Sequence, residues 1–318
     1  MFAVEKNIAM DSILMKKAYM KTVCDLAADE RVYTLDADLL LALGDEFREA
    51  YPNRAIDVGI AEANMVGIAG GLSAAGKIPY VHTFAPFLSR RAFDQTYIAI
   101  GYAKQNAKFI ASDPGIFAEH NGGTHTEFSD MSIMRGVPDA TVIEPADRVA
   151  LESVVRSLKD AYGFAYVRMP RCAVEKIYTD SSQMEIGKGN VLREGKDVTI
   201  IASGYMLARA LYAADTLAQW GISARVVDMF TWKPIDKELI ERCARETGAI
   251  VTAENHHVLT GLGSAVASVL AECCPTPIEF VGVGDAVGQV GTLAELAEAF
   301  GLTEERIIAK AKRAVARK

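Results

Sequence analysis

A glutamate at the start of a glycine-containing apolar stretch is the strongest chemical signal in this sequence. Glu62 follows a turn, and Gly67, Gly70 and Gly71 lie in the helix that it should open. By itself, a glutamate in the first turn of a helix complements the helix dipole, which is an ordinary structural role. Each glycine weakens a helix by about 1 kcal/mol relative to alanine, which makes sense where another helix approaches closely. A carboxylate at the head of such a helix should be desolvated, and this favours a proton donor over a surface cap.

Two phenylalanines follow the next predicted strand, which covers residues 79–84. Phe84 and Phe87 stand at the carboxyl end of that strand, where open α/β sheets bind their ligands. Both rings could belong to the core, or they could form a platform on which a flat heterocycle stacks. The residues alone leave these two interpretations equal.

A glycine loop brings three further polar side chains together. His120, Asn121 and His125 surround Gly122 and Gly123, after a predicted strand that ends at residue 112. Polar side chains on one such loop indicate a ligand contact more often than a solvated turn. The two histidines are not a helical zinc pair, because the glycines break the helix.

Other motifs in the chain are weak. The glycine runs at 261–266 and 282–288 have the wrong placement for a dinucleotide-binding fingerprint, and no P-loop, GxSxG or HExxH motif occurs. The five cysteines form no CxxC pair, so neither a zinc knuckle nor a disulfide framework is expected. We expect buried, reduced thiols.

The elements that would position these residues alternate in type along the chain. Strands are predicted at 32–36, 79–84, 108–112, 140–144 and 165–169, and helices at 12–28, 62–75, 89–105 and 146–160, the last capped by Asp147. Such alternation is typical of a parallel sheet with helices on both faces.

A second alternating unit follows a polar stretch. Residues 172–196 lose the periodicity and are predicted to be a linker, which places a domain boundary near residue 185. Strands are then predicted at 197–203, 223–229, 249–254 and 278–283, with helices at 206–220, 237–247, 262–273 and 303–317. The sequence therefore predicts two α/β domains, residues 1–185 and 186–318.

The composition excludes several classes of protein. Lys+Arg 34 against Asp+Glu 41 gives a net charge of -7, and no segment is strongly basic, so nucleic acid is not an expected partner. No stretch of about 18 apolar residues occurs that could span a membrane. The first residues include acidic side chains and no unbroken apolar run, so a signal peptide is not expected. We expect a cytoplasmic protein without a membrane partner.

These motifs, taken in order, resemble transketolases. The resemblance rests on residues 54–72 around Glu62, Thr-Phe-Ala-Pro-Phe-Leu-Ser-Arg-Arg-Ala-Phe-Asp-Gln (83–95), Gly-Gly-Thr-His (122–125), residues 132–138, residues 197–204 and Glu-Asn-His-His (254–257). It covers the pyrimidine-binding and C-terminal domains of that family. The Gly-Asp-Gly motif of the diphosphate-binding domain is absent, so the chain resembles the C-terminal subunit of a split transketolase.

The resemblance implies a role for each motif. Thiamine diphosphate would be the cofactor, with Glu62 at N1′ of its aminopyrimidine, Phe84 and Phe87 around that ring, and Asp38 close by. His125 matches a histidine that contacts substrate hydroxyls, and is implied, with Glu62, as catalytic. Mg²⁺ and the diphosphate would be held by an N-terminal partner subunit, which would meet this chain in an α2β2 assembly, so no metal ligand is expected here.

The substrate residues implied by the resemblance depart from the family pattern. Arg168 matches an arginine that holds the acceptor's phosphate. Lys16 stands where transketolases have a phosphate-binding arginine, and Ala42 stands in place of a serine. Asn121 replaces an aspartate that contacts a sugar hydroxyl, and Asp113 replaces a donor-binding histidine. Lysine lacks the bidentate fork of arginine. We therefore predict ketol transfer between (phospho)sugars with altered substrate selectivity.

Two alternatives remain open at this point. The β subunit of a 2-oxo acid dehydrogenase E1 component has the same two domains and the same cofactor, although the motifs at 83–95 and 122–125 look transketolase-like. A non-catalytic regulatory subunit could also keep the fold. Retention of Glu62, both phenylalanines and His125 argues against that alternative. Reductive acylation of a lipoyl domain would indicate the E1 component, whereas ketol transfer would indicate a transketolase.

Overall fold

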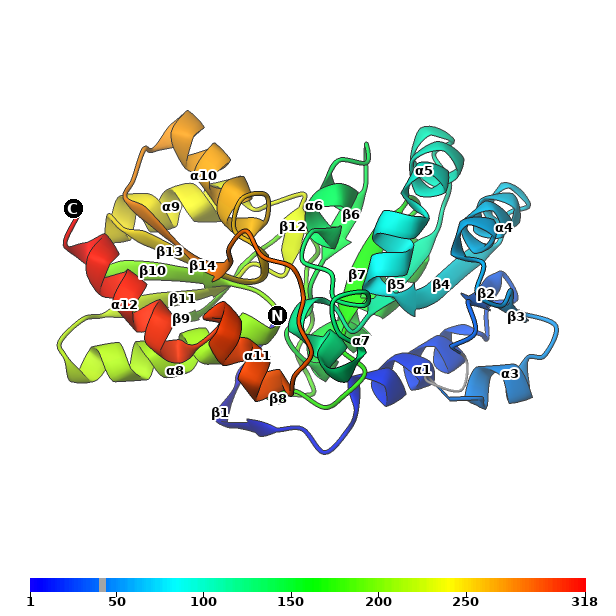
Figure 1. The fold of residues 1–318 in the computed structure, drawn as a ribbon, viewed down its shortest axis with the longest axis horizontal. Helices are drawn as coiled ribbons and strands as arrows, with labels where there is room; N and C mark the ends of the chain where they lie inside the picture. The colour runs from blue at the N-terminus through cyan, green and yellow to red at the C-terminus, as the bar shows by residue number, and fades with distance from the viewer. Residues whose placement is uncertain (40–43) are drawn as a thin grey trace.

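The computed structural model describes residues 1–39 and 44–318, and it consists of two α/β lobes side by side (Figure 1). The larger sheet has seven strands in the order β12-β6-β7-β5-β4-β2-β3, and only β12 is antiparallel to its neighbour. In this order the strands are β12 (Thr231–Lys233), β6 (Thr141–Ile143), β7 (Ala165–Met169), β5 (Lys108–Ser112), β4 (Ile78–Phe84), β2 (Val32–Asp36) and β3 (Ala55–Asp57).

Helices cover both faces of this sheet. The residues of β4 alternate between two hydrophobic clusters: Tyr80 belongs to the one that includes residues of α1 and α7, and Val81 belongs to the one that includes residues of α4 and α6. This is the two-residue period of a strand that is buried on both faces. The helical segments of this lobe are α1 (Met15–Leu26), α3 (Glu46–Ala50), α4 (Glu62–Ala74), η1 (Phe87–Arg91), α5 (Phe93–Gln95), η2 (Thr96–Tyr102), η3 (Gly115–Asn121), α6 (Asp130–Arg135) and α7 (Arg148–Asp160).

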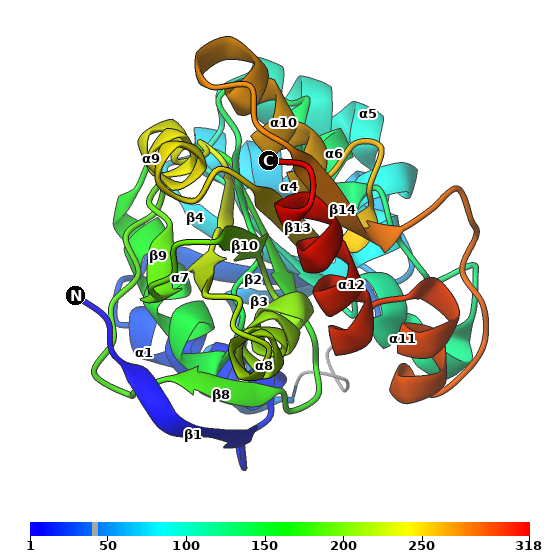
Figure 2. The ribbon, with the colours of Figure 1, turned by 90° about the vertical axis from the view of Figure 1, so that its left-hand side faces the viewer.

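The second lobe has a five-stranded sheet in the order β14-β13-β10-β11-β9, with β9 antiparallel. In Figure 2 the helices α9 and α10 lie above this sheet, and α8 and α12 lie below it. The bounds are β9 (Asn190–Arg193), β10 (Val198–Ala202), α8 (Tyr205–Gln219), β11 (Ala224–Asp228), α9 (Lys237–Thr247), β13 (Ile250–His257), α10 (Leu262–Cys273), β14 (Ile278–Val283), α11 (Leu293–Phe300) and α12 (Glu304–Val315). The prediction of two α/β domains is confirmed.

The two lobes exchange chain segments. Strand β12 comes from the second half of the sequence but pairs with β6 of the first sheet. The stretch 172–196, predicted to be a linker, contains β9 and also β8 (Glu175–Tyr178), which pairs with β1 (Val4–Met10). That prediction was wrong in part, because these short strands are stabilised by distant partners rather than by a local hydrophobic pattern.

The sequence predicted a helix end more accurately than it predicted a helix interior. Asp147 caps α7 as predicted, since its carboxylate accepts a hydrogen bond from the Ala150 amide at 2.8 Å. The helix predicted over 89–105 is instead a series of π-helical and α-helical segments. Ser89 and Thr96 donate to the carbonyls of Ala85 and Ala92, four residues back, which is a known cause of helix distortion. Within the described part of the chain, no helix is both long enough and apolar enough to cross a membrane.

Candidate active site

The carboxyl ends of β2, β4, β5 and β7 lie along one edge of the large sheet, because these strands are parallel. The loops that leave this edge contain Asp38, Asp113 and Glu119, whose φ angles are 60°, 49° and 44°. Positive φ values at residues other than glycine cost about 1–3 kcal/mol each and cluster at functional sites. We therefore expect the functional site at this edge of the sheet.

Five of the predicted residues line a single cleft of about 140 Å³, here called the aromatic cleft. These five residues are Asp38, Glu62, Phe84, Phe87 and His125. The three rings meet edge to face: the centroid of His125 lies 5.5 Å from Phe84 and 5.2 Å from Phe87. Such a ring cluster around one carboxylate suits a flat, polar heterocycle.

Glu62 is the buried acid of this cleft. It opens α4, its side chain is 2% exposed, and both carboxylate oxygens accept hydrogen bonds of 2.8 Å from Arg91. The guanidinium of Arg91 also lies over the ring of Phe87, 4.1 Å from its centroid. Glu62 is therefore held by a side chain that is itself half exposed, so the carboxylate can change partner without rearrangement of the core.

The loop that carries Asp38 is fixed by buried groups beneath it. Asp36 accepts a hydrogen bond from the Leu39 amide at 2.6 Å and pairs with Nδ1 of His82 at 2.6 Å. Asp57 accepts a hydrogen bond from the Asp38 amide at 3.0 Å. These contacts hold Asp38 in its left-handed conformation at the mouth of the aromatic cleft.

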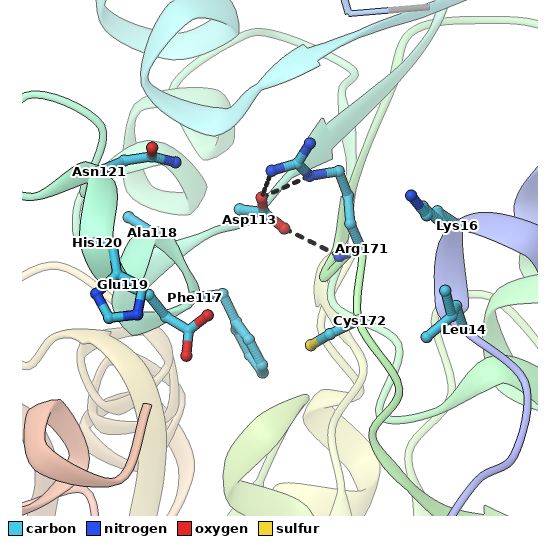
Figure 3. A pocket seen from close by; sticks show the side chains of 10 residues that line it. All are labelled: Leu14, Lys16, Asp113, Phe117, Ala118, Glu119, His120, Asn121, Arg171 and Cys172. Atoms are coloured by element: carbon cyan, nitrogen blue, oxygen red, sulfur yellow. Dashed lines mark hydrogen bonds and ion pairs between the residues drawn. The ribbon is translucent and has the colours of Figure 1, made fainter. Parts of the chain in front are cut away.

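A second, larger pocket of about 430 Å³, here called the outer pocket, contains the remaining polar candidates (Figure 3). Its lining residues are Leu14, Lys16, Asp113, Phe117, Ala118, Glu119, His120, Asn121, Arg171 and Cys172. In Figure 3, Arg171 and Lys16 approach the pocket from one side, and the loop of His120 and Asn121 approaches it from the other.

Cys172 is exposed at this pocket, and Cys243 is the buried cysteine of the five. The prediction of buried thiols therefore holds for one cysteine, and all five are unbridged.

Phe84 lies between the aromatic cleft and the outer pocket. Its ring lines the aromatic cleft, while the guanidinium of Arg171 lies 4.8 Å from its centroid on the side of the outer pocket. Asp113 binds Arg171 through a hydrogen bond from its amide at 2.9 Å and from Nε at 2.6 Å. Burial raises the pKa of Asp113, and the Arg171 guanidinium opposes that rise. The arrangement resembles a reaction centre with an adjoining binding site for a polar tail.

Arg168 does not belong to either hollow, and its prediction as a phosphate ligand is wrong. Its side chain is 0% exposed, paired with Asp130 and, at 2.7 Å, with Glu144. It also donates to the carbonyl of Asn255 at 2.9 Å. Burial alone would lower the pKa of Arg168, but the two carboxylates raise it. Every strong contact of this guanidinium is made inside the protein.

Arg171, three residues later, lines the outer pocket and was not among the predicted site residues. The signal was present: β7 ends at Met169 and Pro170 follows it, so Arg171 is the first polar side chain beyond the carboxyl edge of the sheet. Arg91 was also missed, since nothing local indicates that it reaches back to Glu62. Ala42 lies outside the described residues.

The aromatic cleft fits the pyrimidine half of a thiamine cofactor. It offers a buried carboxylate for a ring nitrogen and aromatic walls for the ring. In contrast, residues 1–39 and 44–318 contain no group of three or more His, Cys, Asp or Glu side chains placed to hold a metal ion. A diphosphate needs a cation at its oxygens.

Comparison with family models identifies the class of protein. The transketolase pyrimidine binding domain model matches residues 11–176, and the transketolase C-terminal domain model matches residues 187–307. The chain belongs to the transketolase family.

Individual relatives give a more particular picture. The chain is 45% identical to the 6-deoxy-6-sulfo-D-fructose transketolase subunit SqwH of Clostridium sp. (strain MSTE9), with 98% of both chains covered. It is 34% identical to one of the subunits of the apulose-4-phosphate transketolase of Phocaeicola vulgatus, covering 94% of this chain and 97% of that protein. Rat transketolase is 35% identical over 95% of this chain, which corresponds to 49% of the rat protein.

A solved structure has the same fold throughout. It is described as the inactive β4 tetramer of a split-gene transketolase, and it superposes with a TM-score of 0.90 at 42% identity, covering 96% of this chain and 99% of that one.

Proposed function

We propose that this chain is the C-terminal subunit of a thiamine-diphosphate-dependent transketolase, which transfers a two-carbon ketol unit between sugars. The observation that carries the proposal is the buried carboxylate of Glu62, which opens into a cleft walled by Phe84, Phe87 and His125. Two relatives of nearly the same length are transketolase subunits, which favours this activity over that of an E1 β subunit.

Each residue of the aromatic cleft has a task in this proposal. When bound, thiamine diphosphate supplies the nucleophilic carbon that cleaves the ketose. Glu62 exchanges its Arg91 partner for the pyrimidine nitrogen N1′ and holds a proton there. Phe84 and Phe87 orient the ring and exclude water, and Asp38 lies at the same edge. His125, whose Nδ1 lies 2.9 Å from the Thr124 hydroxyl, faces the substrate hydroxyls.

The remainder of the cofactor site is proposed to come from an N-terminal partner subunit. This chain aligns with about half of rat transketolase, and its described residues offer no metal cluster. The partner would hold the diphosphate and Mg²⁺, and its docking would complete the cleft in the cytoplasm. The solved structure named as a β4 tetramer is also named inactive, which is consistent with an incomplete site.

Self-association is proposed to occur along α4, giving an α2β2 assembly. Of the three glycines in α4, only Gly70 meets a close neighbour within the described chain, since a Cβ there would lie 3.0 Å from the carbonyl oxygen of Ala99. Gly67 and Gly71 are exposed and have open space beside them. The close approach expected from these glycines is therefore used inside this chain only at Gly70, against η2, and the open side at Gly67 and Gly71 is available to a second copy.

The substrate is proposed to be a sugar with an anionic end seated in the outer pocket. Arg171 replaces Arg168 as the arginine for that end, with Lys16, Asp113 and Asn121 around it. One relative acts on 6-deoxy-6-sulfo-D-fructose and another on apulose 4-phosphate, so anionic groups of two kinds occur among similar proteins. Lys16, Asp113 and Asn121 depart from the family pattern and support altered selectivity.

Reconstitution tests the proposal. The purified chain should bind thiamine diphosphate weakly and show no ketol transfer, and activity should appear on mixing with an N-terminal transketolase subunit, Mg²⁺ and cofactor. Full turnover by this chain alone would refute the split-enzyme proposal. Reductive acylation of a lipoyl domain without ketol transfer would instead identify an E1 component, and no chemistry in any mixture would support a regulatory subunit.

A further inference from the structure

The outer pocket contains as many formal negative charges as positive ones. Lys16 and Arg171 are its cationic side chains, and Asp113 and Glu119 are its anionic ones. A site built for a doubly charged anion would be expected to carry a surplus of cationic groups. The formal sum of zero is therefore unusual for a pocket that should receive a sugar phosphate.

Asp113 supplies one of the two negative charges, and it lies directly against Arg171. Its carboxylate oxygens contact Nε, Nη2 and the amide of Arg171 at 2.6–2.9 Å, so the positive charge of that arginine is already paired on the pocket wall. Figure 3 shows the pair at the top of the pocket, with Glu119 below it. Glu119 accepts a hydrogen bond from the Leu293 amide at 3.0 Å, which fixes a second carboxylate at the same rim.

Part of the lining is also apolar. Leu14, Phe117 and Ala118 also line the pocket. Such a wall tolerates a weakly hydrated anion better than a strongly hydrated one, because less hydration is lost on binding. A sulfonate spreads one charge over three oxygens, whereas a phosphate monoester carries nearly two charges at neutral pH.

We propose that Asp113 is a specificity-determining residue that sets the outer pocket to accept a singly charged anionic end, of the alkyl sulfonate class, in preference to a dianionic phosphate monoester. The inference rests on the proposed transketolase function and names the substrate class of the same site. Arg171 would orient the sulfonate oxygens, and Asp113 would repel the second charge of a phosphate.

The test compares a matched pair of ketoses, one ending in a sulfonate and one in a phosphate ester, on the complex reconstituted with its N-terminal subunit at pH 8. The ratio of kcat/KM for sulfonate to that for phosphate should exceed ten in the wild type. Asp113→Asn keeps an oxygen for Arg171 but removes the charge, so the ratio should fall at least tenfold. Asp215→Asn, the same change on α8 in the other lobe, should leave the ratio unchanged.

Fragment binding to the purified chain gives a second measurement that does not depend on ketol transfer. Methanesulfonate should bind more tightly than methyl phosphate, and Asp113→Asn should reverse that order. A wild-type preference for phosphate, an unchanged ratio in Asp113→Asn, or binding of neither fragment would overturn the inference. If neither ketose reacts while the fragments behave as expected, the proposed function fails and the assignment of the pocket stands.

Discussion

Arg168 and Arg171 stand three residues apart, yet they meet opposite environments. Arg168 lies in β7 and is completely buried between Asp130 and Glu144, next to the backbone of β13 from the other lobe. Arg171 lies just beyond the end of β7, with its side chain 26% exposed, and it pairs with one carboxylate on the wall of the outer pocket. One arginine joins the two lobes, and the other faces the space where a ligand would lie.

The comparison shows that burial determines which role an arginine side chain can have. A buried charge is tolerated only when partners satisfy it, so Arg168 cannot be released to a substrate without a large cost. Although burial opposes the effect, Arg168 lowers the pKa of Asp130, which keeps that partner ionised. Arg171 has water on one side and can exchange partners. Changes in the buried interior should therefore affect stability, and changes at the open edge should affect activity.

Replacement of Arg168 is expected to give the largest effect. Arg168→Ala leaves two carboxylates buried without their cation, which should reduce the free energy of unfolding by about 3–5 kcal/mol. Arg168→Lys should fall between this variant and the wild type. The matched change Arg171→Ala should cost less than about 1 kcal/mol, as is usual for a partly exposed pair. Urea denaturation of the purified chains measures the free energy of unfolding of all three variants. Equal losses for Arg168→Ala and Arg171→Ala would show that burial does not distinguish the two arginines.

Glu62→Gln should act almost only on activity. Glutamine can still accept hydrogen bonds from Arg91 but cannot hold the required proton, so the rate should fall by a factor of ~10² or more. The measurement is exchange of the C2 proton of thiamine diphosphate in the reconstituted complex. Glu272→Gln on α10, an exposed position, serves as the control. Exchange at the wild-type rate would leave Glu62 with the role of a helix cap.

Arg171→Gln should weaken substrate binding without changing the chemistry. Loss of one charged hydrogen-bonding partner costs about 1.5–3 kcal/mol, so the KM for an anionic ketose should rise tenfold or more while kcat changes little. Arg245→Gln, an exposed change on α9, is the matched control. The same rise in KM for an uncharged ketose would show that Arg171 does not contact the anionic end.

The last expected effect, which is small over any single pH unit, concerns Asp228, a buried carboxyl of the second lobe. Burial raises the pKa of Asp228 to about 8, while the hydrogen bond of 2.7 Å from the Tyr178 hydroxyl opposes that rise. The folded state then keeps a proton that the unfolded state has lost, so stability falls as the pH rises from about 4 to 8. Between pH 6 and pH 7 the loss should be about 1 kcal/mol.

Asp228→Asn keeps the partner of Tyr178 and removes the titration. Its free energy of unfolding should therefore depend less on pH than that of the wild type over this range. Parallel pH profiles for the two proteins would mean that Asp228 is ionised in the folded state. Asp215→Asn, at an exposed position, should follow the wild-type profile and controls for the loss of a carboxylate.

The sequence by itself determined the local features of this protein. The spacing of apolar residues predicted most strands of both sheets, and the strand–turn–helix pattern located Glu62 and Phe84 at the carboxyl edge. These signals are local because a strand's period and a helix's first turn depend on neighbouring residues. The motifs around them were also sufficient to indicate the family.

Only the tertiary structure decided which charged side chains are buried and which are exposed. Nothing within a few residues of Arg168 indicates that Asp130, Glu144 and a strand from the other lobe enclose it, and β12 and β8 form only because distant strands pair with them. Likewise, the pairing of Arg91 with Glu62 and of Arg171 with Asp113 joins residues 29 and 58 positions apart. Such contacts arise from the packing of elements, so a one-dimensional pattern does not contain them.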